Sequence, residues 1–493
     1  EWQTALEYVA NKIKLIKNAH GAQAIGALAT PHSTLEELYL LQKLVRGLGS
    51  GNVDFRLRQT DFSADDARRG APWLGMKIAD LNALDRVLVI GSALRKDHPL
   101  IAHRLRQAVK RGMQLSLINP ADDELMIPVA NRMIVAPARM TQALAEVLKA
   151  AAEAKNSSCP APLEKIKPSR EAKRIAESLL SGKNIAVFFG NSAQHHPQAG
   201  ALHALAQELA ALTGAKFGFF GEAANSVGGY LAEAVPADGT GKTAKAMLGH
   251  PLKGYLVLNA EIELDCHDPQ AALAALRSAE LVVALSAYKH KAVEYAQVLL
   301  PISPFTETAG TFINTEGRMQ SFNGVVKPLG ESRPAWKVLR VLGNLLGLTG
   351  FEQESIEQVR VEILPKGGVE PARLDNGLRR PVSAGIETPV SGGLQRIADV
   401  PIYQADAIAR RAASLQKTRD ADVPAAWLNG KLFERLSLRE GDKVKLTQGR
   451  GKAVLIARRD DKLPDNCVRV ASAHPLTADL GEMFGEITVE RVA

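Results

Sequence analysis

A chain of 493 residues is too long for a single hydrophobic core and is expected to divide into about three units. With 46% hydrophobic and 23% charged residues, its composition is that of an ordinary soluble globular protein. The net charge of +8 is carried by scattered basic pairs such as Arg379-Arg380 and Arg410-Arg411, and no basic stripe with interleaved aromatic residues supports nucleic-acid binding. A docking face for an anionic partner or a membrane surface remains open.

No apolar run approaches the roughly 18 residues that a membrane-spanning helix requires, and no signal peptide is recognisable. Because the sequence opens on Glu1 and not on Met, we expect it to be a fragment of a longer protein. Cys159, Cys266 and Cys467 lie far apart in the sequence. Three isolated thiols cannot supply a disulfide framework, a zinc site or the four thiolates that hold an iron–sulfur cluster.

The first predicted elements form half of a βαβ unit. Thr4, with Glu7 three residues later, is expected to cap an amphipathic helix that ends at Gly21. A short apolar strand follows at residues 24–29. The next helix, residues 35–48, is expected to be capped by Ser33 or Thr34 together with the glutamates of its first turn.

Further apolar strands recur along the chain, each followed by a turn or a capped helix, as in parallel β/α units. They are predicted at residues 86–91, 115–118, 185–189, 255–259 and 281–287.

Two polar clusters look reactive but have simpler interpretations. His195, His196 and His203 do not share one helical face at ligand spacing, so we interpret them as the polar start of a helix. The Asp265-Cys-His-Asp268 run precedes a proline, so N-capping of the next helix explains it.

The C-terminal part changes character. Residues 349–401 are rich in Pro, Gly and charge and are interpreted as a connection between domains. Residues 402–493 contain short alternating strands, with a hairpin predicted at Gly449-Arg450-Gly451, and are expected to form a small β-barrel.

The most informative stretch is residues 301–324, PISPFTETAGTFINTEGRMQSFNG, a polar, turn-rich segment directly after an apolar strand. In open α/β sheets such segments are binding loops outside the carboxyl ends of the strands. An ordinary surface loop is the alternative. We expect Arg318 to pair with Glu307 or Glu316, and Gly310 and Gly317 to adopt backbone conformations that are costly for other residues.

This loop carries an LP…E…G.(F/Y).N.EGR pattern that resembles a segment of the molybdopterin oxidoreductases, late in their second α/β domain. Residues 49–61 (GSGNVDFRLRQTD) and the GD.V.L.…GRG….A signature at residues 441–453 resemble two further segments of that family. Within the family, ETAGTFINTEGRMQSFNG is most similar to the large G subunits of the proton-pumping NADH:quinone oxidoreductase, respiratory complex I. The pattern residues are Glu307, Gly310, Asn314 and Arg318.

The resemblance also implies where a pterin cofactor and its molybdenum would be held. In the family the metal ligand, usually cysteine or selenocysteine and in some branches serine or aspartate, lies six residues after the Asp of an Asn-Val-Asp segment. Here that position is Thr60, and the adjacent Asp61 is expected to form a salt bridge or to cap the following turn. The family positions that contact the nucleotide arm correspond to Gly91 and to Asn119, where an acidic residue is common. Thr60 is a poor donor for molybdenum, so we expect these positions to be vestigial and the chain to hold no cofactor, no metal and no catalytic residue.

The implied fold is two Rossmann-like parallel-sheet domains followed by the barrel. One domain is discontinuous, formed by residues 1–54 and 235–348, and residues 55–234 form the other, dinucleotide-binding-like domain inserted into it. Residues 349–401 then lead to the barrel at 402–493.

The implied function is a structural, non-catalytic part of the complex I G subunit in the peripheral arm, on the cytoplasmic side of the bacterial inner membrane. Its partners would be other peripheral-arm subunits, with neither nucleic acid nor membrane insertion. The [2Fe–2S] and [4Fe–4S] clusters of the parent subunit would lie on cysteine motifs that precede this region. The alternatives are an active molybdenum oxidoreductase of the formate dehydrogenase or nitrate reductase type, with Asp61 as ligand, and a binding module for another nucleotide.

Overall fold

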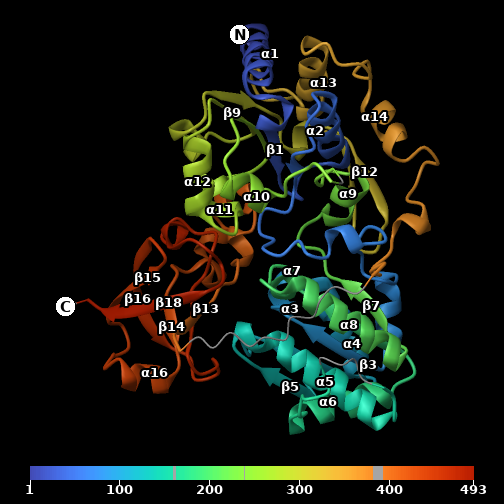
Figure 1. The fold of residues 1–493 in the computed structure, drawn as a ribbon, viewed down its shortest axis with the longest axis vertical. Helices are drawn as coiled ribbons and strands as arrows, with labels where there is room; N and C mark the ends of the chain where they lie inside the picture. Colours follow the sequence, from blue (N-terminus) through green and yellow to red (C-terminus); the bar gives the residue numbers. More distant parts are fainter. Residues whose placement is uncertain (159–162, 238, 381–391, 493) are drawn as a thin grey trace. The chain divides into compact units, whose positions relative to one another are not determined.

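A computed structural model describes residues 1–158, 163–237, 239–380 and 392–492 (Figure 1). The chain divides into two compact units. Unit 1 comprises Glu1–Arg58, Ala223–Leu374 and Ala405–Ala413, and unit 2 comprises Gln59–Glu222, Asp375–Gln404 and Ser414–Ala493. Cys159 lies outside the described residues, whereas Cys266 and Cys467 are buried free thiols.

Unit 1 is built on a parallel sheet with the strand order β10-β9-β8-β1-β2. Its strands are β1 (Ile25–Ala29), β2 (Val53–Asp54), β8 (Gly254–Leu258), β9 (Leu281–Ser286) and β10 (Val298–Pro301). Every residue of β1 and β8 is buried, which is why these strands are continuous apolar runs in the sequence. The strands predicted at 24–29, 255–259 and 281–287 are confirmed to within one residue.

Helices cover both faces of this sheet. Leu28, Val257 and Ala284 pack against apolar residues of α10 and α12. On the other side, α1 and α2 contact β1, and α13 packs against both of these helices (Figure 1). The helices of unit 1 are α1 (Trp2–His20), η1 (Ala22–Ala24), α2 (Leu35–Gly47), α9 (Ser226–Leu231), α10 (Ala244–Gly249), α11 (Ile262–Asp265), α12 (Pro269–Arg277), η6 (Lys291–Glu294), η7 (Phe305–Glu307), α13 (Ala335–Leu345), α14 (Ile356–Ile363), η8 (Pro371–Arg373) and α15 (Ala407–Arg411).

Two capping boxes are predicted in this unit, at Thr4 and at Ser33 or Thr34, and only the second is confirmed. Thr34 and Glu37 form a capping box at α2, with both reciprocal hydrogen bonds present. The prediction for Thr4 was wrong, because α1 already begins at Trp2 with no side-chain cap. Thr4 therefore lies in the first turn of α1, which is held by the burial of its apolar face.

The segment 301–324 is more regular than a loop. After β10 it forms an antiparallel hairpin of β11 (Gly310–Ile313) and β12 (Met319–Phe322). Strand β11 contacts α2 and α9, so the segment is packed onto the body of unit 1.

The second parallel sheet lies in unit 2 and has the strand order β5-β4-β3-β6-β7. Leu88 and Ile90 of β3 enter a core with α5, α6 and α8, whereas Val87 and Val89 enter the opposite core with α4. This alternation places helices on both faces of a doubly wound sheet. The elements are η2 (Asp65–Ala67), η3 (Ile78–Ala83), β3 (Arg86–Ile90), α3 (Leu94–Asp97), α4 (Pro99–Val109), β4 (Gln114–Asn119), β5 (Asn131–Ile134), η4 (Pro137–Arg139), α5 (Met140–Ala154), α6 (Arg170–Leu180), β6 (Ile185–Phe189), α7 (Asn191–Gln194), α8 (Ala199–Thr213) and β7 (Lys216–Phe219).

The C-terminal part of unit 2 is a closed barrel in the order β13-β17-β14-β16-β15-β18, which confirms the predicted fold class. Its core holds apolar residues of β14, β15, β16 and β18 together with Leu432 of α16. The predicted hairpin is confirmed, since Gln448 pairs with Gly451 across the turn. The elements are β13 (Leu394–Ile397), η9 (Ile402–Gln404), η10 (Leu415–Lys417), η11 (Arg419–Ala421), β14 (Ala426–Leu428), α16 (Gly430–Arg435), β15 (Lys443–Gln448), β16 (Gly451–Arg459), β17 (Cys467–Arg469), η12 (Ala478–Leu480) and β18 (Glu486–Arg491).

The predicted connection at 349–401 requires correction where the structure describes it. Its first part carries α14, which contacts α2 in unit 1, and its last part carries β13, which is a barrel strand. Residues 405–413, expected in the barrel, belong to unit 1 instead. The Pro and Gly content of the stretch concealed these elements because each of them is short.

Candidate functional site

Thr60, the family's metal-ligand position, lies in unit 2 and is bonded to the backbone. Its hydroxyl donates a hydrogen bond of 2.6 Å to the carbonyl oxygen of His195, and the residue is only 8% exposed. The neutral threonine hydroxyl has no tendency to ionise near neutral pH, unlike the thiolate or carboxylate that serves as a metal donor. The residue does not fit the role of a molybdenum ligand.

Asp61, the neighbouring carboxylate, is engaged through both oxygens. Oδ1 accepts the backbone N–H of Ser63 at 2.9 Å, and Oδ2 accepts the backbone N–H of Gly200 in the first turn of α8 at 2.7 Å. These bonds join residues 61–63 to α8. Of the two roles expected for this side chain, capping is the one that the structure shows.

Gly91 and Asn119, the positions of the nucleotide arm, are likewise occupied by local packing. Gly91 has φ +63°, and a Cβ there would lie 2.8 Å from the Cβ of Ala193. The Asn119 side chain accepts from the Ser92 N–H at 3.0 Å and donates to the Ser92 carbonyl at 2.9 Å. Together these contacts close the turn after β3 onto the ends of β4 and α7.

The three histidines between residues 195 and 203 bind different groups. The Nε2 atom of His195 lies 3.2 Å from a carboxylate oxygen of Glu222, whereas His196 and His203 contact the carbonyl oxygens of Pro137 and Asn376, each at 2.8 Å. Burial lowers the pKa of His196 to about 4 and that of His203 to about 3. Both rings are therefore neutral at physiological pH and act as buried hydrogen-bonding groups.

In unit 1, the pattern positions of the 301–324 segment stabilise the hairpin itself. The Asn314 side chain accepts from the N–H groups of Glu316 and Arg318 at 3.1 and 2.9 Å, which forms the turn between β11 and β12. One Glu307 oxygen accepts from the Leu329 N–H at 2.9 Å. Arg318 pairs with Glu316 at 2.9 Å, as one of the two predicted partners, although its side chain remains 66% exposed.

The two glycines of this segment have different roles. Gly317 adopts φ +80°, as predicted. The prediction for Gly310 was wrong, because it lies in β11 without a positive φ. Its small size matters instead, since a Cβ there would collide with the side chain of Thr34, the N-cap of α2.

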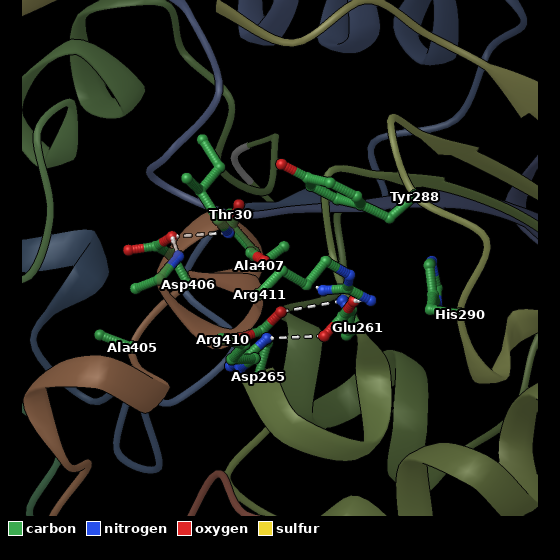
Figure 2. Close-up of polar contacts among 12 residues, drawn as sticks. Thr30, Glu261, Asp265, Tyr288, His290, Ala405, Asp406, Ala407, Arg410 and Arg411 are labelled. Carbon is green, nitrogen blue, oxygen red and sulfur yellow. Dashed lines mark hydrogen bonds and ion pairs between the residues drawn. The ribbon is translucent and has the colours of Figure 1, made fainter. Parts of the chain in front are cut away.

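A buried ion cluster at the carboxyl edge of the unit 1 sheet was missed by the sequence analysis (Figure 2). Glu261 follows β8, and Asp265 ends the short helix α11 that comes next. Arg410 of α15 lies 3.1 Å from Glu261 and 2.6 Å from Asp265, and Arg58 contacts the same Asp265 oxygen at 3.0 Å. The side chains of Glu261, Asp265, Arg58 and Arg410 are between 4% and 6% exposed.

Burial and the neighbouring charges together set the pKa values of the carboxyl groups in and beside this cluster. Burial alone would raise the pKa of Asp265, but Arg410 and Arg58 outweigh that effect, so the pKa lies below its usual value. For Glu263, in the same short helix, burial outweighs the attraction of Lys291 and raises the pKa to about 7.

The prediction that the run from Asp265 to Asp268 caps the next helix is half right. Asp268 caps α12 through the N–H groups of its first turn, whereas Asp265 belongs to the ion cluster.

Unit 2 has a cavity of about 490 Å³ at the carboxyl edge of its own sheet. It is lined by residues after β3 and β4 and by barrel residues, with an excess of carboxylates that includes Asp97, Asp123 and Asp399. Arg469 bridges two of them, at 2.7 Å from Asp123 and 3.1 Å from Asp399. Burial and the carboxylates of Asp399 and Asp123 raise the pKa of Asp97 to about 7.

The described residues lack two further features. No three His, Cys, Asp or Glu side chains among them are grouped as a metal site would require. Within the same residues, each helix is too short or too polar to traverse a lipid bilayer.

Comparison with known proteins places these observations in a family. Probable oxidoreductase YjgC of Bacillus subtilis strain 168 is 25% identical over 462 residues, which cover 79% of this chain and 47% of YjgC. The G subunit of the NADH-quinone oxidoreductase of Mycobacterium tuberculosis is 26% identical over 381 residues, which cover 69% of this chain and 44% of that protein. The chain spans about half the length of the curated relatives it matches.

The fold is also shared with a solved structure. Acetylene hydratase from Pelobacter acetylenicus superposes with a TM-score of 0.76 at 15% identity, over 100% of this chain and 89% of the hydratase. The family model described as molybdopterin oxidoreductase matches residues 1–345, which is more than half of the sequence. The chain therefore belongs to the molybdopterin oxidoreductase family.

Proposed function

We propose that this chain is the molybdopterin-oxidoreductase-like, non-catalytic part of an NADH:quinone oxidoreductase G subunit. In that role it is a structural element of the peripheral arm of complex I, on the cytoplasmic side of the bacterial inner membrane. Its partners are the neighbouring peripheral-arm subunits. It holds neither molybdenum nor a pterin.

The proposal rests mainly on the hydrogen bonds that the side chains of Thr60 and Asp61 form. A metal ligand needs an anionic donor aimed at the metal. The structure gives a neutral hydroxyl bonded to the His195 carbonyl and a carboxylate whose two oxygens each accept a backbone N–H. Freeing Asp61 would leave the N–H of Gly200 without this partner, at a cost of about 1–3 kcal/mol if that N–H stayed buried.

The likeness to a G subunit of NADH-quinone oxidoreductase supports the choice within the family. On this proposal electrons pass through [2Fe–2S] and [4Fe–4S] clusters on cysteine motifs of the parent protein. The present 493 residues contain three widely spaced cysteines and no such motif. The chain then contributes shape and contacts to the assembly, and no redox centre.

One purification tests both parts of the proposal. The full chain, tagged and produced with ample molybdate in a bacterium that makes complex I, is isolated under mild conditions and analysed for co-purifying subunits, molybdenum and extractable pterin. We expect peripheral-arm subunits in the eluate and no near-stoichiometric molybdenum or pterin. The same assay is run on Asp61→Ala and on Asp66→Ala, an exposed carboxylate nearby that serves as the matched control.

The rival function, an active molybdenum oxidoreductase, makes the opposite prediction. Near-stoichiometric molybdenum that is lost in Asp61→Ala and retained in Asp66→Ala would promote that rival. Absence of molybdenum together with absence of peripheral-arm subunits would remove the complex I assignment.

A further inference from the structure

The carboxyl edge of the unit 1 sheet presents two carboxylates in a fixed arrangement. Glu261 lies three residues after the end of β8, and its own N–H donates to Oδ2 of Asp265 at 2.8 Å, so the two residues are joined at the start and end of α11. Tyr288 follows β9, the neighbouring strand of the sheet, and its ring lies against the side chain of Arg411 (Figure 2). In an open α/β sheet this edge is where a ligand binds.

Helix α15 fills this edge with two guanidinium groups. The Arg410 fork reaches both carboxylates, with Nη1 3.1 Å from Glu261 and Nη2 2.6 Å from Asp265. Arg411 lies 2.5 Å from the other Glu261 oxygen, and its guanidinium carbon lies 4.4 Å from the centre of the Tyr288 ring. Figure 2 shows both arginines extending from α15 toward this group of side chains.

These partners match what a guanidinium requires. A planar fork binds best to two acceptors placed side by side, and its face stacks on an aromatic ring. An ammonium group is a compact point charge that satisfies only part of this geometry. The cluster therefore has the chemistry of a guanidinium-binding site rather than of an unspecific acidic patch.

The arginines, and not apolar burial, hold α15 in place. None of the apolar residues of α15 is buried, and its one large apolar side chain, Ile408, is 45% exposed. The segment Ala405–Ala413 belongs to unit 1, while the chain on either side of it belongs to unit 2. A further attachment within unit 1 is a weak hydrogen bond of 3.4 Å from Arg58 to the Ala405 carbonyl.

We propose that the carboxyl edge of the unit 1 sheet is a guanidinium-recognition site that the chain occupies with its own Arg410. Helix α15 acts as a ligand that is part of the same chain, with Arg410 bound to the two carboxylates and Arg411 stacked on Tyr288 at the side of the site. A free alkylguanidinium binds at Glu261 and Asp265 when the Arg410 side chain is removed. The negative charges of Glu261 and Asp265 would repel the phosphate groups of a nucleotide, so a nucleotide is excluded from this site. The inference does not depend on the complex I assignment.

Chemical rescue tests this proposal in the full chain. The Arg410→Ala variant is probed by hydrogen–deuterium exchange of residues 258–266 and 405–413, with millimolar ethylguanidinium or with n-propylammonium at the same ionic strength. We expect exchange in these segments to be about tenfold faster than in the wild type, since local opening is no longer opposed by the buried ion pairs. Ethylguanidinium should restore the slow exchange saturably, and n-propylammonium should not.

Two control variants make the outcome specific. Arg106→Ala removes an exposed arginine of α4 and should neither change exchange in these segments nor respond to ethylguanidinium. Adding Asp265→Asn to Arg410→Ala should abolish the rescue, because the carboxylate that binds Nη2 is lost. Rescue by both cations alike, or rescue that survives Asp265→Asn, would overturn the proposal.

A milder variant covers the case in which Arg410→Ala does not fold. Arg410→Lys keeps the positive charge but replaces the fork with a single ammonium. We expect a folded protein with faster exchange confined to residues 258–266 and 405–413. Exchange identical to that of the wild type would show that charge alone suffices and would refute recognition of the guanidinium shape.

Discussion

At the positions where the family holds its cofactor and metal, the side chains of this chain form hydrogen bonds to its own backbone. Asn119 satisfies both the N–H and the carbonyl of Ser92, and Thr60 donates to the His195 carbonyl. Such bonds are worth about 1 kcal/mol each, and leaving a buried partner unpaired costs more. A cofactor that recruited these groups would first have to break them, so local stability and ligand binding compete at these positions.

The raised pKa of Asp97 predicts that the stability of the protein depends on pH. Burial together with Asp399 and Asp123 raises its pKa from 3.8 to about 7, while Arg469 opposes this in part. Between these values the folded protein retains a proton that the unfolded chain has released. The stability contributed by the protonated Asp97 carboxyl is therefore fully present below about pH 4 and is lost as the pH rises through 7.

The Asp97→Asn variant isolates this contribution. We expect it to lie close to the wild type near pH 4 and to exceed it in unfolding free energy by about 3–4 kcal/mol at pH 8, because the amide cannot ionise. Urea unfolding at a series of pH values measures the difference. Curves that stay parallel across the whole range would show that the pKa of Asp97 is the same in the folded and the unfolded protein.

At the scale of elements, long apolar strands were predictable and short polar contacts between distant segments were not. The buried strands of both sheets and the 449–451 hairpin followed from hydrophobicity and turn residues. The role of Arg410 did not, because its partners stand some 150 residues earlier and a buried arginine looks like any other basic residue in the sequence. The acidic run from Glu261 to Asp265 was the one local signal, and only its neighbour Asp268 proved to be a helix cap.

The packing of β11 on α2 can be tested through Gly310. A Cβ at this position would collide with Thr34 and lie 2.9 Å from the ring of Phe322, so Gly310→Ala should destabilise the protein by about 1–3 kcal/mol. The control is Gly249→Ala in α10, where a Cβ meets nothing within 4 Å. Thermal unfolding should separate the two variants, and equal melting temperatures would show that the hairpin moves away from α2 at little cost.

On the scale of the whole molecule, each unit contains its own hydrophobic core. Unit 1 buries the residues around Leu28 and Val257, and unit 2 buries two layers about its sheet and a third inside the barrel. These cores are built from the chain's own side chains, and the edge of the unit 1 sheet is closed by α15. We therefore expect each unit to fold without a bound group.

If neither unit needs a cofactor to fold, the melting temperature should not depend on whether the host makes one. A cofactor that binds only the folded state adds about 4 kcal/mol at a concentration of 1,000 times its Kd, and at roughly 2–4 °C per kcal/mol this raises the melting temperature by some ten degrees. The full chain produced in a host that cannot synthesise molybdopterin should instead melt at the same temperature, and resist protease equally, as the chain from a competent host. A melting temperature lower by ten degrees, or rapid proteolysis of the cofactor-free protein, would mean that a bound pterin is part of the native structure.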